Sequence, residues 1–181
     1  MKNAAILILL VISLVRCHSE TKSRNAMSDK TDQQSNSPGF FNDTIPKVTG
    51  IGGIFFFSDD PDKAREWYSK NLGLEVNQWG SSFEFRNANR PEEINYLQWS
   101  PFKAGSEYFA PSKKEFMINY RVQNIEGLIS KLRDNGVTIL DSIESYDYGK
   151  FVHIMDAEGN KIELWEPVDK VFNEMDGNTT K

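Results

Sequence analysis

The chain has 181 residues, of which 39% are hydrophobic and 12% aromatic, and its formal net charge is −5. This is enough apolar material for one globular domain with its own core. The acidic balance, without a stripe of Lys and Arg, argues against a nucleic acid as the partner. The single cysteine, Cys17, excludes an intramolecular disulfide and a metal site built from cysteines.

Residues 1–17 predict an export signal. The apolar run Ala4–Val15 has the length of a signal peptide and is too short to span a bilayer as a helix. Leu14–Cys17 is similar to a bacterial lipoprotein box, in which the cysteine takes the lipid. We expect an exported protein, either periplasmic or anchored to the membrane only through a lipid on Cys17. If translation starts at Met27, we expect a cytoplasmic protein instead.

The remaining chain divides into a tether, a domain and a tail. Residues 18–45 are mostly Ser, Thr, Asn, Gln, Lys and Asp, and a segment with so few apolar residues is predicted to be disordered. The folded domain is expected over residues 46–168. Residues 169–181 are polar, and we expect them to form a frayed tail.

The domain is predicted to begin with a strand and an amphipathic helix. The apolar run Ile51–Phe57 is typical of a strand buried on both faces. Asp59 or Asp60 is expected to cap the helix, and Gly73 to end it in the left-handed conformation. Its buried stripe is predicted to comprise Ala64, Trp67, Tyr68 and Leu72. Three short strands are expected next, at Leu74–Trp79, Ser82–Arg86 and Ile94–Trp99.

The second half of the domain repeats this plan. Phe116–Val122 predicts a strand, Asn124 a helix N-cap, and Gly136 the left-handed end of that helix. Further strands are expected at Val137–Leu140 (running towards Ser145), Lys150–Met155 and Lys161–Glu166. Two such units in one chain indicate an internal repeat.

Two segments carry a family resemblance. SDDPDKAREWYSKNLGLEV (58–76) and DAEGNKIELWEP (156–167) resemble the opening and closing signatures of the vicinal oxygen chelate superfamily, the glyoxalase, bleomycin-resistance and extradiol-dioxygenase group. The resemblance implies an α+β fold, in which two βαβββ modules pair their sheets into a curved, cup-like half barrel around the active site. It also implies a homodimer.

The resemblance further implies four metal-ligand positions, which fall on Gly52, Gln98, Met117 and Glu163. Glycine offers no donor, and the thioether of methionine is a soft ligand that suits hard divalent ions poorly. We therefore predict no metal and no other cofactor, while a divalent metal in a glyoxalase-type site stays open. His153 is the domain's one histidine, which excludes the 2-His-1-carboxylate iron site of extradiol dioxygenases.

We predict that the cup binds a small amphipathic molecule. Glu163 is the candidate catalytic residue, with Arg121 or Lys150 as partner for its charge, and the candidate ligand-binding residues are Asn119, Arg121, Trp99, Tyr148 and Trp165. One alternative is a glyoxalase- or isomerase-type lyase with Glu163 as general base. Another is an envelope scaffold whose cup is vestigial.

Overall fold

The computed structural model of the protein describes residues 44–174 and 178–181. The predicted signal peptide, the predicted lipid site at Cys17 and nearly all of the predicted tether lie outside the described residues. Within the described residues, no helix is long and apolar enough to cross a membrane.

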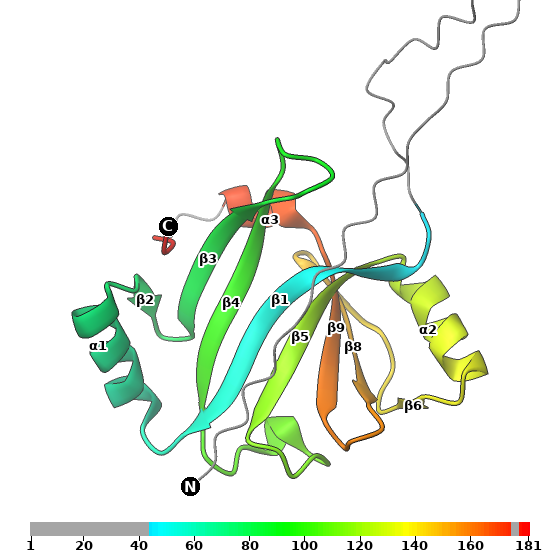
Figure 1. The fold of residues 1–181 in the computed structure, drawn as a ribbon, viewed down its shortest axis with the longest axis horizontal. Helices are drawn as coiled ribbons and strands as arrows, with labels where there is room; N and C mark the ends of the chain where they lie inside the picture. Colours follow the sequence, from blue (N-terminus) through cyan, green and yellow to red (C-terminus); the bar gives the residue numbers. More distant parts are fainter. Residues whose placement is uncertain (1–43, 175–177) are drawn as a thin grey trace, which may run out of the picture. The chain divides into compact units, whose positions relative to one another are not determined.

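The first module begins at a strand and a capped helix, as predicted (Figure 1). The carboxylate of Asp60 accepts a hydrogen bond from the backbone N–H of Lys63, and Gly73 ends the helix at φ 72°. The elements are β1 (Lys47–Ser58), α1 (Pro61–Leu72), β2 (Val76–Asn77), β3 (Gly80–Arg86) and β4 (Ile94–Lys103).

The second module repeats the first, except for one additional short strand. Asn124 caps its helix, because its Oδ1 accepts a hydrogen bond from the Gly127 N–H at 3.0 Å. A 3₁₀ turn, η1 (Glu107–Phe109), precedes this module. The elements are β5 (Phe116–Gln123), α2 (Ile125–Asp134), β6 (Thr138–Ile139), β7 (Glu144–Tyr146), β8 (Gly149–Met155) and β9 (Lys161–Pro167), followed by α3 (Asp169–Glu174). The two short strands β6 and β7 both pair with β8, where the first module has the single strand β2 on β3.

The two modules share one curved sheet. Its strand order is β2-β3-β4-β1-β5-β9-β8-β6, and β7 also pairs with β8. Within each module the first and last strands are parallel, β1 with β4 and β5 with β9, while β1 and β5 pair antiparallel and join the modules. This arrangement confirms the predicted α+β fold of two paired βαβββ modules.

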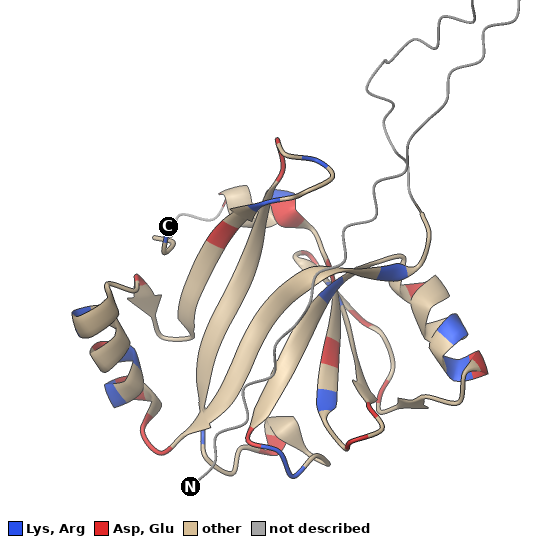
Figure 2. Cartoon of the chain, viewed as in Figure 1, with Lys and Arg blue, Asp and Glu red and all other residues tan. Residues whose placement is uncertain are grey.

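Side-chain alternation gives the sheet two faces. The outer face carries Val152 and Leu164, which form a core with Ile125, Leu128 and Ile129 of α2. The opposite face, here called the inner face, carries Asn119, Arg121, Glu163 and Trp165, all buried. η1 and α3 lie against the inner face. Figure 2 shows charged residues mainly on the helices and loops, and few along β1 and β4.

The prediction that β1 is buried on both faces is wrong. Ile51 and Ile54 are 43% and 38% exposed, whereas Gly52, Gly53 and Phe55 are buried. α1 packs on β2 and β4, and α2 packs on β6 and β9, so neither helix covers the outer side of β1. The apolar run therefore correctly indicates a central strand of the sheet, but it does not indicate that both faces of this strand are covered.

The predicted buried stripe of α1 is also wrong, because no residue of α1 is buried. Trp67 is 54% exposed. Tyr68 does reach the sheet, where its ring lies 4.6 Å from that of Trp99.

The tail is ordered where the structure describes it, contrary to the predicted fraying. Asp169 in α3 forms an ion pair with Arg121. Near the end of the chain, Thr180 donates its N–H to the carbonyl of Ser82 and shares a hydrogen bond with the hydroxyl of Ser81. These partners are distant in sequence, so the local polar composition gave no sign of them.

Candidate functional site

A polar row crosses the inner face from strand to strand. Strand register aligns its members, each on a neighbouring strand of β3, β4, β1, β5, β9 and β8: Ser82, Gln98, Gly53, Asn119, Glu163 and His153. Neighbouring strands are about 4.8 Å apart, so side chains on adjacent strands can bond directly. Ser82 bonds Gln98, and Glu163 bonds both Asn119 and His153. Gly53 leaves a gap between Gln98 and Asn119. Glu163 lies near one end of this row and carries its only carboxylate.

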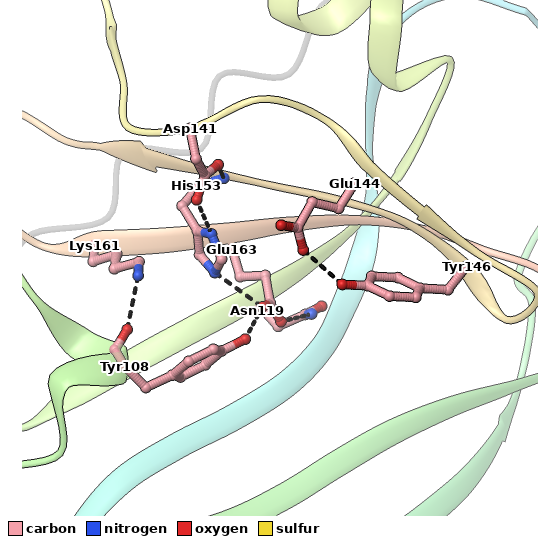
Figure 3. A network of polar contacts seen from close by, with 8 residues as sticks. All are labelled: Tyr108, Asn119, Asp141, Glu144, Tyr146, His153, Lys161 and Glu163. Atoms are coloured by element: carbon pink, nitrogen blue, oxygen red, sulfur yellow. Dashed lines mark hydrogen bonds and ion pairs between the residues drawn. The ribbon is translucent and has the colours of Figure 1, made fainter.

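The Glu163 carboxylate is almost fully buried, with 4% of the residue exposed, and three side chains donate hydrogen bonds to it. Asn119 Nδ2 lies 2.6 Å from Oε1, His153 Nε2 lies 3.0 Å from Oε2, and the Tyr108 hydroxyl donates to the same Oε2 (Figure 3). Burial opposes the charged form, but these donors outweigh it, so the pKa of Glu163 lies below its ordinary value. Glu163 is therefore held as an anion.

His153 lies between two carboxylates. Its Nδ1 is 2.6 Å from Asp141 Oδ2, and its backbone N–H donates to Asp141 Oδ1 at 2.8 Å. Burial disfavours the imidazolium, but the hydrogen bonds to Glu163 and Asp141 and the charge of Glu163 outweigh it and raise the pKa of His153. The result is an Asp141–His153–Glu163 chain in which the histidine is the cation.

Tyr108 connects η1 to the Asp141–His153–Glu163 hydrogen-bond chain through its bond to Glu163. Its ring stacks on Phe102, with centroids 5.2 Å apart, and its carbonyl accepts a hydrogen bond from Lys161 Nζ at 2.7 Å. Burial and the nearby charge of Glu163 both raise the pKa of Tyr108, so the phenol stays protonated and donates. Tyr108 remains 39% exposed and gives the Glu163 network an outer edge.

The structure brings most of the predicted site residues together. Asn119, Arg121, Glu163 and Trp165 share the inner face, and the ring of Tyr148 lies at its rim, 5.6 Å from that of Phe151.

Two of the predictions about the site are wrong. Trp99 lies on the outer face of β4, against Phe56 and Tyr68, because it alternates with the inner-facing Gln98. The predicted partners of Glu163 have other roles, since Arg121 pairs with Asp169 and Lys150 with Glu126.

The four family ligand positions do not fit a metal. A Cβ on Gly52 would lie 2.8 Å from Trp165 Cε3 and 2.9 Å from Arg121 Cγ, and still closer to Asn119 Oδ1. Met117 is fully buried beside Phe55 and Phe109.

The remaining two positions already have bonds within the protein. Gln98 accepts a hydrogen bond from the Ser82 hydroxyl at 2.7 Å and donates to Ser100, and Glu163 accepts its three donors. Among the described residues, no group of three or more His, Cys, Asp and Glu is arranged to hold an ion.

The sequence reasoning missed Tyr108 and Asp141. Tyr108 stands 55 positions before Glu163 in a Gly-, Ser- and Pro-punctuated loop, and Asp141 stands 12 before His153. Neither lies in a motif. Only His153 offered a signal, as the one histidine of the predicted domain.

Next to this network, aromatic rings cluster on the inner face. The rings of Tyr146 and Tyr148 stack at 5.2 Å and 8°, and those of Phe151 and Trp165 stack at 5.8 Å and 8°. The two tyrosines are 49% and 38% exposed. Exposed aromatic groups beside buried polar ones are typical of surfaces that bind amphipathic partners.

The comparisons with known proteins agree on one family. The profile of the Glyoxalase/Bleomycin resistance protein/Dioxygenase superfamily matches residues 50–164. A search of curated proteins gives no match.

Solved structures of methylmalonyl-CoA epimerases share the fold. One, in complex with methylmalonyl-CoA and NH4+, has 16% identity and a TM-score of 0.52 over 67% of this chain and 96% of its own. A Streptomyces coelicolor epimerase variant has 16% identity and a TM-score of 0.51 over 67% of this chain and 99% of its own.

The close approach of three side chains to Gly52 predicts the effect of a methyl group there. Gly52→Ala should lower the free energy of unfolding by about 1–3 kcal/mol, because the added Cβ overpacks the inner face. Urea denaturation measures this. Gly50→Ala is the matched control on β1, since its Cβ would meet only Arg121 Cδ, at 3.9 Å. Equal losses in both variants would contradict the assigned crowding.

The Glu163–His153 pair predicts a pH dependence of stability. Because the folded pKa of His153 lies above its ordinary value of 6.5, its contribution is complete below about 6.5 and is lost as the pH rises through the folded pKa. Unfolding free energies from about pH 6 to about pH 9 should therefore fall in the wild type, and fall less in Glu163→Gln. Glu126→Gln, which removes an exposed carboxylate from α2, should keep the wild-type slope. A wild-type slope in Glu163→Gln would contradict the pairing.

Proposed function

Since the chain belongs to the glyoxalase/bleomycin resistance protein/dioxygenase superfamily, we propose that it uses the superfamily's cup to bind a small amphipathic molecule without the superfamily's metal. The carrying observation is the half-exposed pair of stacked tyrosines, Tyr146 and Tyr148, beside the buried Glu163–His153 pair. The rings offer a flat apolar surface, and the network behind them offers fixed charges and a phenol.

Two further features support binding over metal chemistry. The inner face has no side chain at Gly52 that could bind a metal. The Glu163 carboxylate already accepts hydrogen bonds from Tyr108, Asn119 and His153. The tyrosine surface also extends inward through Phe151 to Trp165, so a bound ring would contact a continuous aromatic cluster.

A fluorescent probe tests this proposal. The full chain should bind 8-anilinonaphthalene-1-sulfonate saturably at one site, and Tyr146→Ala should weaken binding by about tenfold, or about 1.4 kcal/mol. Trp67→Ala is the matched control, because Trp67 is equally exposed but lies on α1. Absence of saturable binding, or equal weakening by both variants, would contradict the proposal.

A second function is favoured by the Asp141–His153–Glu163 chain, namely proton transfer of the glyoxalase or isomerase type. Glu163 is a weak base here, because its three donors lower its pKa. Glu163 would take the substrate's α-proton and return it, while His153 and Tyr108, whose pKa values are raised, stay protonated and hold the Glu163 carboxylate by hydrogen bonds. The epimerases of the same fold make methylmalonyl-CoA a reasonable test compound.

The measurement is proton exchange at the α-carbon of methylmalonyl-CoA in heavy water, followed by NMR. If the chain transfers protons, exchange should fall by about 100-fold in Glu163→Gln and in His153→Gln, because general acid–base catalysis contributes at least that much. Asp60→Asn, which changes only the cap of α1, should leave the exchange rate unchanged. Exchange no faster than in buffer would remove this second function and leave the binding proposal standing.

A further inference from the structure

The C-terminal helix α3 fills one end of the inner face with an aromatic ring. The ring of Phe172 lies 5.4 Å from that of Tyr96, 5.5 Å from that of Trp165 and 6.4 Å from that of Tyr148. The Tyr96 hydroxyl also donates a hydrogen bond to Asn173 Oδ1 at 2.8 Å. Three rings from β4, β9 and the turn before β8 thus surround one phenylalanine.

The same helix, α3, supplies the carboxylate of Asp169 to the buried guanidinium of Arg121. Arg121 is 3% exposed, donates to the carbonyl of Tyr96 at 3.0 Å, and pairs with Asp169. Burial lowers the pKa of Arg121, and the charge of Asp169 opposes that effect. A buried guanidinium without an anion is strongly unfavourable, so this position requires a carboxylate or an equivalent group.

Asp169 satisfies that requirement incompletely. Its Oδ2 accepts from Arg121 and, at 3.1 Å, from Asn95 Nδ2, but its Oδ1 is buried without a hydrogen-bond partner. Buried polar atoms of native proteins are nearly always paired. A freely oriented carboxylate could use both oxygens, whereas that of Asp169 is fixed by the helix.

We propose that α3 is a built-in mimic of the ligand, and that the ligand is a small aromatic carboxylate that displaces it. The ligand's carboxylate would take the place of Asp169 on Arg121 and Asn95, and its ring would take the place of Phe172. This inference rests on the proposed binding function and names its ligand class. Both subsites adjoin Trp165, since Arg121 Cζ lies 5.1 Å from its ring and the Phe172 ring lies 5.5 Å from it. Asp169 and Phe172 are three positions apart on α3, less than one helical turn, so a small ligand could take the place of both.

An open cavity leads to the carboxylate position. It has a volume of about 190 Å³ and is lined by Arg90, Arg121, Glu166 and Asp169 among others. Arg90, which pairs with Glu93 at 2.9 Å, lies in the lining beside the Arg121–Asp169 pair. Asp169 lies in the lining of this cavity, so a ligand carboxylate would enter beside the ion pair that it is proposed to replace.

The test is calorimetric titration of the full chain with 3-phenylpropionate. Phe172→Ala and Asp169→Ala should each bind it at least about tenfold more tightly than the wild type, because each removes part of the competing helix. Lys170→Ala is the matched control, since the Lys170 side chain is 83% exposed and pairs only with Glu174. 3-Phenylpropanol lacks the carboxylate, so it should bind to Asp169→Ala at least about tenfold more weakly than 3-phenylpropionate binds to the same variant.

The outcomes separate the two proposals. Unchanged or weaker binding of 3-phenylpropionate in both variants, while the naphthalene probe still binds, overturns the mimic and leaves the binding function. Equal affinity for the alcohol overturns the carboxylate subsite. If a variant does not fold, amide hydrogen exchange of the wild type tests displacement. Adding 3-phenylpropionate should speed exchange of the α3 amides, because displacement exposes them to water. Unchanged or slower exchange would overturn displacement.

Discussion

The buried carboxylate of Glu163 is the constraint on which the inner face depends. A charge removed from water is tolerated only when other groups replace its hydration. The donors come from three different elements: Tyr108 from η1, Asn119 from β5 and His153 from β8. One side chain on β9 therefore fixes how the two neighbouring strands and the preceding 3₁₀ turn meet.

The same arrangement involves two of the family's metal-ligand positions, Gly52 and Glu163. Where relatives that use a metal would need a ligand on the first strand, Gly52 leaves room for Asn119, Arg121 and Trp165 to fold over the strand. The Glu163 carboxylate, at another of these positions, accepts hydrogen bonds from three side chains of the protein. The cup thus keeps the superfamily's framework, and the Glu163 carboxylate at its centre accepts its hydrogen bonds from within the chain.

The inner face is consequently divided into three parts. A polar row runs across the middle, the phenylalanine cluster with Met117 lies at the η1 end, and aromatic rings surround Phe172 at the α3 end. In the middle part, three side chains donate hydrogen bonds to the Glu163 carboxylate. The α3 end is held by one short helix through the Arg121–Asp169 ion pair, hydrogen bonds from Asn95 and Tyr96, and the Phe172 ring, and it is the part that we propose a ligand replaces.

The sequence alone determined the repeated strand–helix plan, the Asn124 N-cap, the first N-cap to within Asp59 or Asp60, and the family, because periodicity and capping are local chemistry. Alternation also placed Glu163 and Trp165 on one face. Only the tertiary structure showed which residues bond to Glu163, on which face of the sheet Trp99 lies, and that residues of the tail pack against the domain. Tyr108, Asp141 and Asp169 reach their partners across long stretches of chain, and such pairings leave no periodic trace in the sequence.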